Sequence, residues 1–469
     1  MQKTFKKLFI FLGLLSFTCM INLTPPNTIS SEAWIVASLL FLMTFWWLTE
    51  TIPLSITAIL PLIIIPVLTE INISEVAKPY SNPVIFLLLG GFILGLGFQK
   101  SNLHLRFAMY VLKKIGSKKK NILSGIIIST FFLSMWLSNT ATCLLMLPIV
   151  VSILEKIQYE NDPLFKKIVI LSIAYSASIG GISTLVGTAP NAIFAGFLIE
   201  NYNIEINFIN WMMFSLPLAI LLILIFWLFS NFLIRDRNSS HIEKNFFCDE
   251  YNKLGVITVK EKITLIILSL TIFLWVSKKF WNSLFNINIS DASIALFGSL
   301  LFFIVPYNNK FNSVLNKDWY KLIPWNILIL FGGGLSLASL INSSGLSDWI
   351  SDYLFIFSKL NIYVIILAMA FLISFMTEVT SNTATTLLFL PIIASFAEKY
   401  EYDIILLTLP VILTASCAFM MPIATPPNAI IFSTNKIKIS FMAKSGFLMN
   451  IVAILICSVW AFYFNHLLK

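Results

Sequence analysis

Charged residues are scarce in this chain. Only 11% of its 469 residues are Asp, Glu, Lys or Arg, whereas 58% are hydrophobic and the mean hydropathy is +0.89. A soluble chain must cover its surface with charge, so this composition excludes a soluble extracytoplasmic enzyme, a nucleic-acid binder and a disordered scaffold. Apolar runs of roughly 18 or more residues indicate spanning helices, and the sequence therefore predicts an all-α polytopic membrane protein.

Cysteine and histidine are also rare. The five cysteines lie far apart, without the spacing of a metal site or of a disulfide framework. A proton relay usually needs a chain of buried Asp, Glu or His. The three histidines instead fall in predicted loops or near the end of the chain: His104, His241 and His466. If the protein couples transport to an ion gradient, sodium is therefore favoured over protons as the coupling ion.

Sequence motifs of membrane-embedded enzymes are absent. Neither HExxH nor GxSG occurs, and no Ser-His arrangement or pair of intramembrane aspartates can be drawn. The chain is therefore not expected to be an enzyme.

Apolar segments follow one another along almost the whole chain. The stretch 122–154 is too long for one crossing and has a polar Ser-Asn-Thr break at 138–140, and 361–396 has the same break at 381–383. Irregular backbone at membrane depth is tolerated only inside protein or beside water, so each stretch is predicted to be a re-entrant hairpin, which leaves about eleven transmembrane helices. The segments are 5–23, 33–52, 53–69, 83–112, 122–154, 168–199, 211–234, 262–281, 291–306, 323–342, 353–396, 404–432 and 441–466.

The positions of Lys and Arg predict the orientation. With the N-terminus in the cytoplasm, 25 of the 31 basic residues fall in inside loops, with Lys278 and Lys279 as the awkward pair outside. The C-terminus is then outside, and the net charge of +9 reflects loop sidedness rather than a nucleic-acid partner. Residues 3–21 could instead be a signal peptide, but no convincing cleavage site follows, which favours a retained helix. Low Arg with high Lys, Ile and Asn usage hints at an AT-rich bacterial genome and hence the cytoplasmic (inner) membrane.

The chain contains an internal repeat. LSNTATCLLMLPI at 137–149 recurs as TSNTATTLLFLPI at 380–392, with ten of thirteen positions identical. GTAPNAIF at 187–194 recurs in the same order as ATPPNAII at 424–431. In both pairs the two copies are separated by nearly the same number of residues. This indicates that one half of the chain is a duplicate of the other, as in many transporters.

The predicted topology gives the two halves opposite orientations. The first hairpin enters from the cytoplasm and the second from outside, so the repeat is inverted and both tips meet near the midplane. Such repeats favour alternating access over a passive channel, whose pore loops usually repeat around the membrane normal. The predicted division is an N-terminal helix and connection (1–32), a first repeat (33–234) with hairpin 122–154, a cytoplasmic linker (235–261), and a second repeat (262–469) with hairpin 361–396.

The repeated residues can bind an anion and hard cations together. Asn139 and Asn382 can donate through nitrogen to an anion or offer oxygen to a cation, and helix ends at the tips add unpaired amides and carbonyls. Prolines in the second motif break the helix and free carbonyls near Gly187 and Ala424, which suit Na+. Within the predicted spans, the carboxylates Glu50 and Glu378 are expected to serve in structural hydrogen bonds or ion pairs.

At these residues the sequence resembles the divalent anion:sodium symporters, a family of dicarboxylate, citrate and sulfate carriers. The resemblance covers WWLTETIPLSITAILPL near residue 50, both SNT segments, and the GTAPN and ATPPN segments. It implies eleven helices and two re-entrant hairpins per protomer, homodimers formed through a scaffold domain, and a transport domain that moves by an elevator mechanism.

The resemblance also implies site residues at matching positions. The first sodium site would use Ser134, Ser138, Asn139 and Gly187. The second would use Thr377, Thr380, Asn382 and Ala424, with Thr380 and Ala424 contributing mainly backbone carbonyls. The substrate would contact Asn139, Thr140, Thr188, Asn382, Thr383, Thr425 and Pro426. One departure from the family pattern is Ala189, where many members have a second proline.

The expected function is import of a C4-dicarboxylate such as succinate, malate or fumarate together with Na+ ions. Two opposed Asn-Thr pairs suit a substrate with an anionic group at each end. A dicarboxylate exchanger remains an alternative, as does a sodium symporter for citrate or sulfate. Exchangers typically carry a basic residue in place of a sodium ligand, and no Lys, Arg or His occupies the matched positions, which favours symport.

Overall fold

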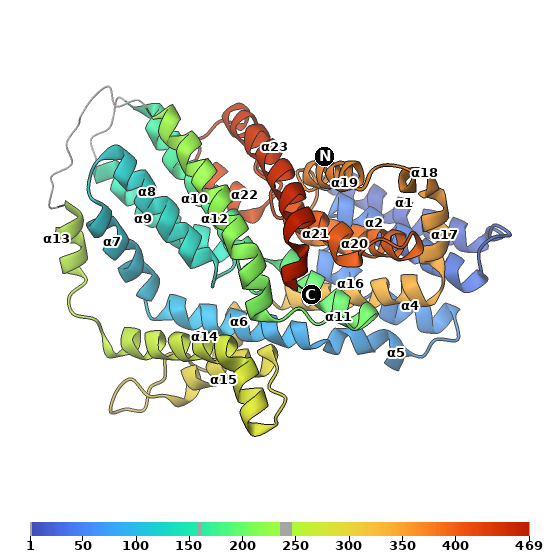
Figure 1. The fold of residues 1–469 in the computed structure, drawn as a ribbon, viewed down its shortest axis with the longest axis horizontal. Helices are drawn as coiled ribbons and strands as arrows, with labels where there is room; N and C mark the ends of the chain where they lie inside the picture. The colour runs from blue at the N-terminus through green and yellow to red at the C-terminus, as the bar shows by residue number, and fades with distance from the viewer. Residues whose placement is uncertain (1, 157–161, 235–245, 469) are drawn as a thin grey trace.

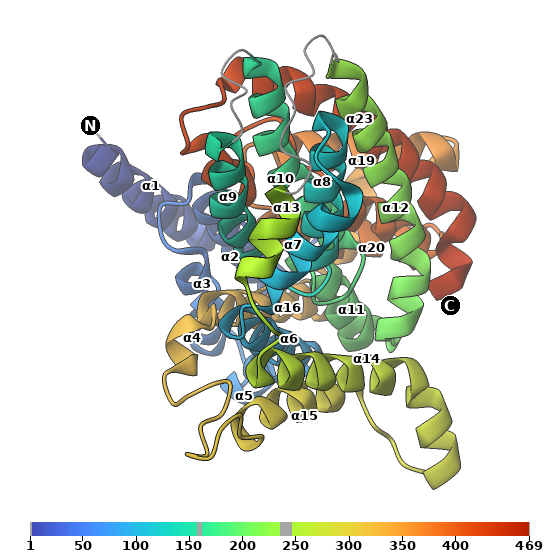
Figure 2. The same ribbon diagram turned by 90° about the vertical axis from the view of Figure 1, so that its left-hand side faces the viewer.

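The computed structural model describes residues 2–156, 162–234 and 246–468, and these residues fold into helices joined by short connections (Figures 1 and 2). Within this part of the chain, extended pairing is limited to one isolated bridge between Pro306 and Ser313. The expectation of an all-helical protein is confirmed for the described residues.

The described residues of the first half of the chain form twelve α-helices and a 3-10 helix. They are α1 (Gln2–Asn22), α2 (Ser31–Thr49), α3 (Leu54–Thr57), α4 (Leu60–Leu68), α5 (Ile73–Ala77), η1 (Lys78–Ser81), α6 (Pro83–Lys100), α7 (Leu103–Ile115), α8 (Lys119–Ser134), α9 (Asn139–Lys156), α10 (Pro163–Ile182), α11 (Ala189–Tyr202) and α12 (Phe208–Leu233).

The second half follows a similar order. It contains α13 (Phe246–Lys253), α14 (Val259–Phe285), α15 (Asp291–Ile304), η2 (Trp319–Leu322), α16 (Trp325–Ser343), α17 (Leu346–Tyr353), α18 (Phe355–Ser358), α19 (Ile362–Met376), α20 (Asn382–Lys399), α21 (Ile404–Ala415), α22 (Pro426–Phe432), α23 (Ile439–Phe464) and η3 (Asn465–Leu468).

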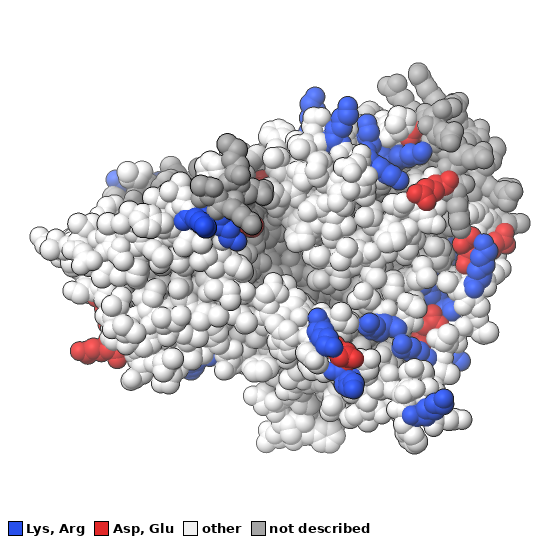
Figure 3. Space-filling model, turned by 180° about the vertical axis from the view of Figure 1, so that it is seen from behind, with Lys and Arg blue, Asp and Glu red and all other residues white. Residues whose placement is uncertain are grey.

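Eight helices of the described chain are long and apolar enough to cross a membrane: α1, α2, α6, α10, α12, α14, α16 and α23. Helix α10 is almost wholly buried, whereas α14 exposes large apolar side chains such as Ile266 (64% exposed) and Val276 (56%). Water would penalise such a surface and hydrocarbon would not. In the view of Figure 3, most Lys and Arg side chains lie on the right-hand half of the molecule, and the left-hand half is largely uncharged.

Three expected segments are divided differently in the structure. The apolar stretch 53–69 is two helices, because Pro61 in the first turn of α4 has no amide to continue the hydrogen bonds of α3. The stretch 83–112 is also two helices, since Asn102 adopts a left-handed conformation (φ 62°) between α6 and α7. The linker expected at 235–261 contains α13, which packs against α7; residues 235–245 lie outside the described chain, and with them Arg235, Arg237 and His241.

The helices break at both copies of each repeated motif. Helix α8 ends at Ser134 and α9 begins at Asn139, while α19 ends at Met376 and α20 begins at Asn382. The second motif starts α11 after the break that follows α10, and α22 after the break that follows α21. Helix α22 packs against α9 and α10, and α11 packs against α20 and α21, so the broken ends of the two halves interleave.

Candidate functional site

A cavity of about 730 Å³ lies where these broken ends meet. Its lining includes both Ser-Asn-Thr segments and both proline-containing segments, one of each from either half of the chain. The opposite wall comes from the end of α2, the start of α3, and residues of α6 and α16. The repeated motifs, about 240 residues apart in sequence, therefore share one cavity.

All seven residues predicted to contact the substrate line this cavity. They are Asn139, Thr140, Thr188, Asn382, Thr383, Thr425 and Pro426. The hydroxyls of Thr140, Thr188 and Thr383 are half-buried, and they make no hydrogen bond within the described part of the chain. These donors are therefore available to a ligand in the cavity.

Four helices begin at the cavity. The first turns of α9, α11, α20 and α22 all line it, and Thr425 caps α22 by accepting a hydrogen bond from the Asn428 amide at 3.2 Å. Each helix N-terminus carries a partial positive charge, and α9, α11 and α20 also have first-turn amides without an acceptor in the described chain. In α22 the first two residues, Pro426 and Pro427, have no N–H, so this helix contributes its dipole alone. Together the four ends favour an anion between them. The lining residues include no Lys, Arg or His, and the described site therefore has no cationic side chain to bind an anion.

Oxygen atoms gather around Asn139 in the first half. One end of its carboxamide lies 2.8 Å from Ser134 Oγ, 3.0 Å from the Ala177 carbonyl and 3.3 Å from the Gly187 carbonyl. With the amide nitrogen at this end, Asn139 donates to all three oxygens; with its oxygen there, four oxygens converge as hard-cation ligands do. Ser138 and Gly187 line the cavity, and Ser134 lies behind Asn139. The cluster therefore contains three predicted ligands and the carbonyl of Ala177, a residue that belongs to neither repeated motif.

The second half repeats this arrangement. Thr377 Oγ1 donates to Asn382 Oδ1 at 2.6 Å and to the Ala415 carbonyl at 3.2 Å, so Thr377 relates to Asn382 as Ser134 relates to Asn139. Ala424 lines the cavity. Thr380 does not line it, and its hydroxyl donates to the Met376 carbonyl at 2.8 Å.

Two buried asparagines hold the broken segments in place. Asn191 Nδ2 donates to the carbonyls of Gly181, Ile182 and Thr184 at 3.0, 3.1 and 2.8 Å. Asn428 occupies the matching place in the second half, and its Nδ2 donates to the carbonyls of Ala418 and Met421, both at 3.1 Å. The repeat contained both residues, yet only the structure reveals that they stabilise the backbone.

Glu378 binds the backbone of the second broken segment. Its buried carboxylate accepts hydrogen bonds from the amides of Phe419, Met420 and Met421 at 2.8 to 2.9 Å, and from Asn450 Nδ2 at 2.7 Å. The expected structural hydrogen bonding of Glu378 is confirmed. The matching position in the first half is Met135, so this stabilisation belongs to the second half alone.

For Glu50 the same expectation is wrong. Its carboxylate makes no ion pair or side-chain hydrogen bond to other described residues, and the residue lines the cavity at the end of α2 with a left-handed backbone (φ 46°). Ser55 and Asn326 also line the cavity and were missed by the sequence reasoning. An ionisable residue in a predicted span was a usable signal for Glu50, whereas Ser55 and Asn326 lie outside the repeated motifs.

Comparison with known proteins gives a consistent result. The family described as the sodium:sulfate symporter transmembrane region matches residues 2–469. The chain is 36% identical over 463 residues to the sodium-dependent dicarboxylate transporter SdcS of Staphylococcus saprophyticus, covering 95% of this chain and 89% of that protein. It is 34% identical over 468 residues to SdcS of Staphylococcus aureus strain USA300, covering 97% and 90%.

A solved structure is also similar. The YdaH transporter of Alcanivorax borkumensis matches with a TM-score of 0.56 over 84% of this chain and 88% of that chain, at 11% sequence identity. At this identity the match bears on the fold alone.

Proposed function

Because the chain belongs to the divalent anion:sodium symporter family, we propose that it is a sodium-coupled secondary carrier that imports C4-dicarboxylates such as succinate, malate and fumarate. The family match confirms the resemblance inferred from the repeated motifs. The chain is accordingly a multi-pass membrane transporter and not an enzyme. The relatives named as sodium-dependent dicarboxylate transporters support both Na+ and a dicarboxylate as transported species.

The observation that carries this proposal is the convergence of four helix N-termini, three of them with free amides, on one cavity without basic side chains. Such a site binds an anion through amides, hydroxyls and bound cations rather than through an ion pair. We assign one carboxylate of the substrate to Asn139, Thr140 and Thr188. The other carboxylate is assigned to the mirrored set Asn382, Thr383 and Thr425, with Pro426 in contact.

The proposed sodium ions occupy the two oxygen-rich clusters beside the tips. Ser134, Ser138, Asn139 and Gly187 form the first set, to which the Ala177 carbonyl is added. Thr377, Thr380, Asn382 and Ala424 form the second. Sodium bound at these positions raises the positive potential at the cavity, and this couples ion binding to anion binding.

The proposed architecture is an inverted repeat with eleven crossings and two re-entrant hairpins, assembled as a homodimer in the cytoplasmic membrane. The mirrored Ser134–Asn139 and Thr377–Asn382 hydrogen bonds support the repeat. The excess of Lys and Arg in the predicted inside loops, 25 of 31, supports an orientation with the N-terminus inside and the C-terminus outside. In the proposed elevator mechanism the tips and broken helices move together against α2, α3 and α16, which form part of the opposite wall of the cavity.

Uptake of radiolabelled succinate into proteoliposomes tests the function. An inward Na+ gradient should drive saturable uptake, and replacing Na+ with K+ should abolish it. Uptake that requires internal dicarboxylate and ignores Na+ would assign the protein to the exchangers. Sodium-driven uptake of citrate or sulfate, but not of succinate, would assign a different substrate to a carrier that is still coupled to Na+.

A further inference from the structure

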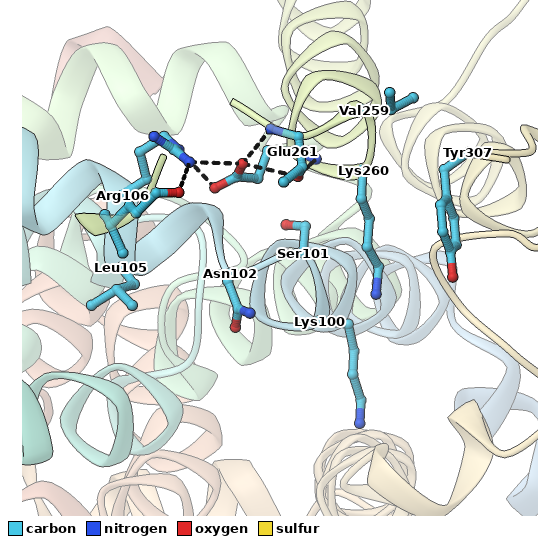
Figure 4. A pocket seen from close by; sticks show the side chains of 11 residues that line it. Lys100, Ser101, Asn102, Leu105, Arg106, Val259, Lys260, Glu261 and Tyr307 are labelled. Carbon is cyan, nitrogen blue, oxygen red and sulfur yellow. Dashed lines mark hydrogen bonds and ion pairs between the residues drawn. The ribbon is translucent and has the colours of Figure 1, made fainter. Parts of the chain in front are cut away.

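A second cavity of about 540 Å³ lies between the end of α6, the start of α7 and the start of α14 (Figure 4). It shares no lining residue with the central cavity. The residues that matter for its chemistry are Lys100, Asn102, Arg106, Lys260, Glu261 and Tyr307.

One wall of this cavity is a fixed and electrically neutral ion pair. Arg106 Nε donates to Glu261 Oε1 at 2.7 Å, and both residues are buried. The same guanidinium donates to the carbonyls of three residues before α14, at 3.0 to 3.3 Å. Glu261 also accepts from the Thr258 amide in a capping box. The wall is therefore held in place, and its charges cancel.

Two lysines give the cavity its net charge. Lys100 ends α6 and Lys260 lies in the first turn of α14, and neither has a carboxylate partner among the described residues. In Figure 4 both side chains run in the same direction, away from the ion pair. Lys260 Nζ lies 5.5 Å from the centre of the Tyr307 ring. With the ion pair neutral, the cavity has an excess of two positive charges.

Neutral hydrogen-bond donors are also available here. The carboxamide of Asn102 has no hydrogen-bond partner in the described chain. The amides of Val259 and Lys260 in the first turn of the 27-residue helix α14 likewise lack an acceptor. Two cations and several donors within one cavity form a suitable environment for an oxyanion such as a phosphate group.

The position of the cavity indicates where that phosphate group comes from. Both α6 and α14 are candidate membrane spans, and the lysines stand at their ends, where lipid headgroups lie. Val259 is 57% exposed beside the cavity, and about two turns further along α14 Leu265 and Ile266 are exposed as well. A lipid bound by its headgroup could therefore lay its acyl chains along this helix.

We propose that this cavity binds the phosphate group of an anionic phospholipid, with Lys100 and Lys260 as the charged ligands. The site is separate from the transport cavity, and the inference does not depend on which anion is carried. Juxtamembrane lysines each contribute enough to anionic-lipid binding that loss of both should weaken binding about tenfold or more.

Native mass spectrometry of the full-length chain in detergent tests the proposal. The probes are phosphatidylglycerol, zwitterionic phosphatidylcholine and inorganic phosphate, each added separately. The double variant Lys100→Gln/Lys260→Gln should bind phosphatidylglycerol about tenfold more weakly, while Lys100→Arg/Lys260→Arg should retain binding. Lys359→Gln is the matched control, because Lys359 also lies over an aromatic ring, 4.6 Å from the centre of Phe355.

The outcomes separate the possible sources of the phosphate. Preference for phosphatidylglycerol over phosphatidylcholine that disappears in the Gln double variant supports the lipid site. Binding of inorganic phosphate with the same lysine dependence supports the anion chemistry but replaces the lipid with free phosphate. Equal binding by the wild type and the Gln double variant, or equal binding of the two lipids, overturns the proposal.

Discussion

Replacing Glu378 by Gln should weaken sodium binding without unfolding the protein. The Oε1 atom of Glu378 accepts from the amides of Phe419 and Met420 and from Asn450, while Oε2 accepts from the Met421 amide at 2.8 Å. A Gln side chain can keep its oxygen at the first position, but its NH2 group then faces the Met421 amide. A hydrogen bond to a charged group contributes about 1.5–3 kcal/mol, and this is the expected cost.

That cost falls on the segment that carries Ala424, a proposed sodium ligand. Met421 is three residues before Ala424, and the Ala424 amide donates to the Met421 carbonyl at 3.2 Å. If sodium must order a loosened segment on binding, its apparent affinity falls by the ordering cost, which corresponds to roughly 10- to 150-fold. Glu378→Ala leaves three buried amides unpaired and should be more severe.

The assay is the Na+ concentration that gives half-maximal succinate uptake in proteoliposomes. Glu378→Gln should raise it by at least tenfold, with a smaller change in the maximal rate at saturating Na+. Glu75→Gln is the control, since Glu75 is exposed in the first turn of α5. A lower maximal rate with an unchanged half-saturating Na+ concentration would refute the link between Glu378 and the segment that carries Ala424.

Three further changes have defined outcomes. A Cβ at Gly181 would overlap Asn139 Oδ1, so Gly181→Ala should abolish uptake. Gly196→Ala should retain uptake, because a Cβ there meets no atom nearer than the end of the Leu335 side chain at 3.3 Å; equal uptake by the two variants would contradict the geometry. Asn428→Ala removes two buried hydrogen bonds and should cost about 1–3 kcal/mol, seen as a lower Tm than that of exposed Asn252→Ala. Although partial burial acts to raise it, hydrogen bonds from Lys119 and the Phe165 amide hold the pKa of Asp162 below its usual value. This stability is present above the unfolded pKa of about 4 and is lost as the pH falls through the lower folded pKa, so Asp162→Asn should reduce the Tm at pH 7 and flatten its fall in acid.

The sequence predicted many of the residues that line the central cavity, because the repeat marked them directly. Both Asn139 and Asn382 lie at helix breaks that line it, as the polar interruptions indicated. The polar break could be recognised because a Ser-Asn-Thr run within a long apolar stretch has no other ready explanation.

Other features have no local signal. Ala177 reaches the first oxygen cluster through its backbone carbonyl, and any residue type could supply that atom. Asn326 reaches the cavity because α16 packs against the broken helices α11 and α20, which depends on tertiary structure. The division of 83–112 at Asn102 did have a local signal, because Gln99, Lys100, Ser101 and Asn102 form a polar run, and the expected apolar segment passed over it.

Equilibrium binding of succinate to the purified protein in Na+, with K+ as the reference, tests the central claim most directly. If both mirrored tips form one site, Asn139→Ala and Asn382→Ala should each abolish sodium-dependent binding, while Asn252→Ala on α13 should bind as the wild type does. Undiminished sodium-dependent binding in either tip variant would contradict a single site built from both halves of the chain.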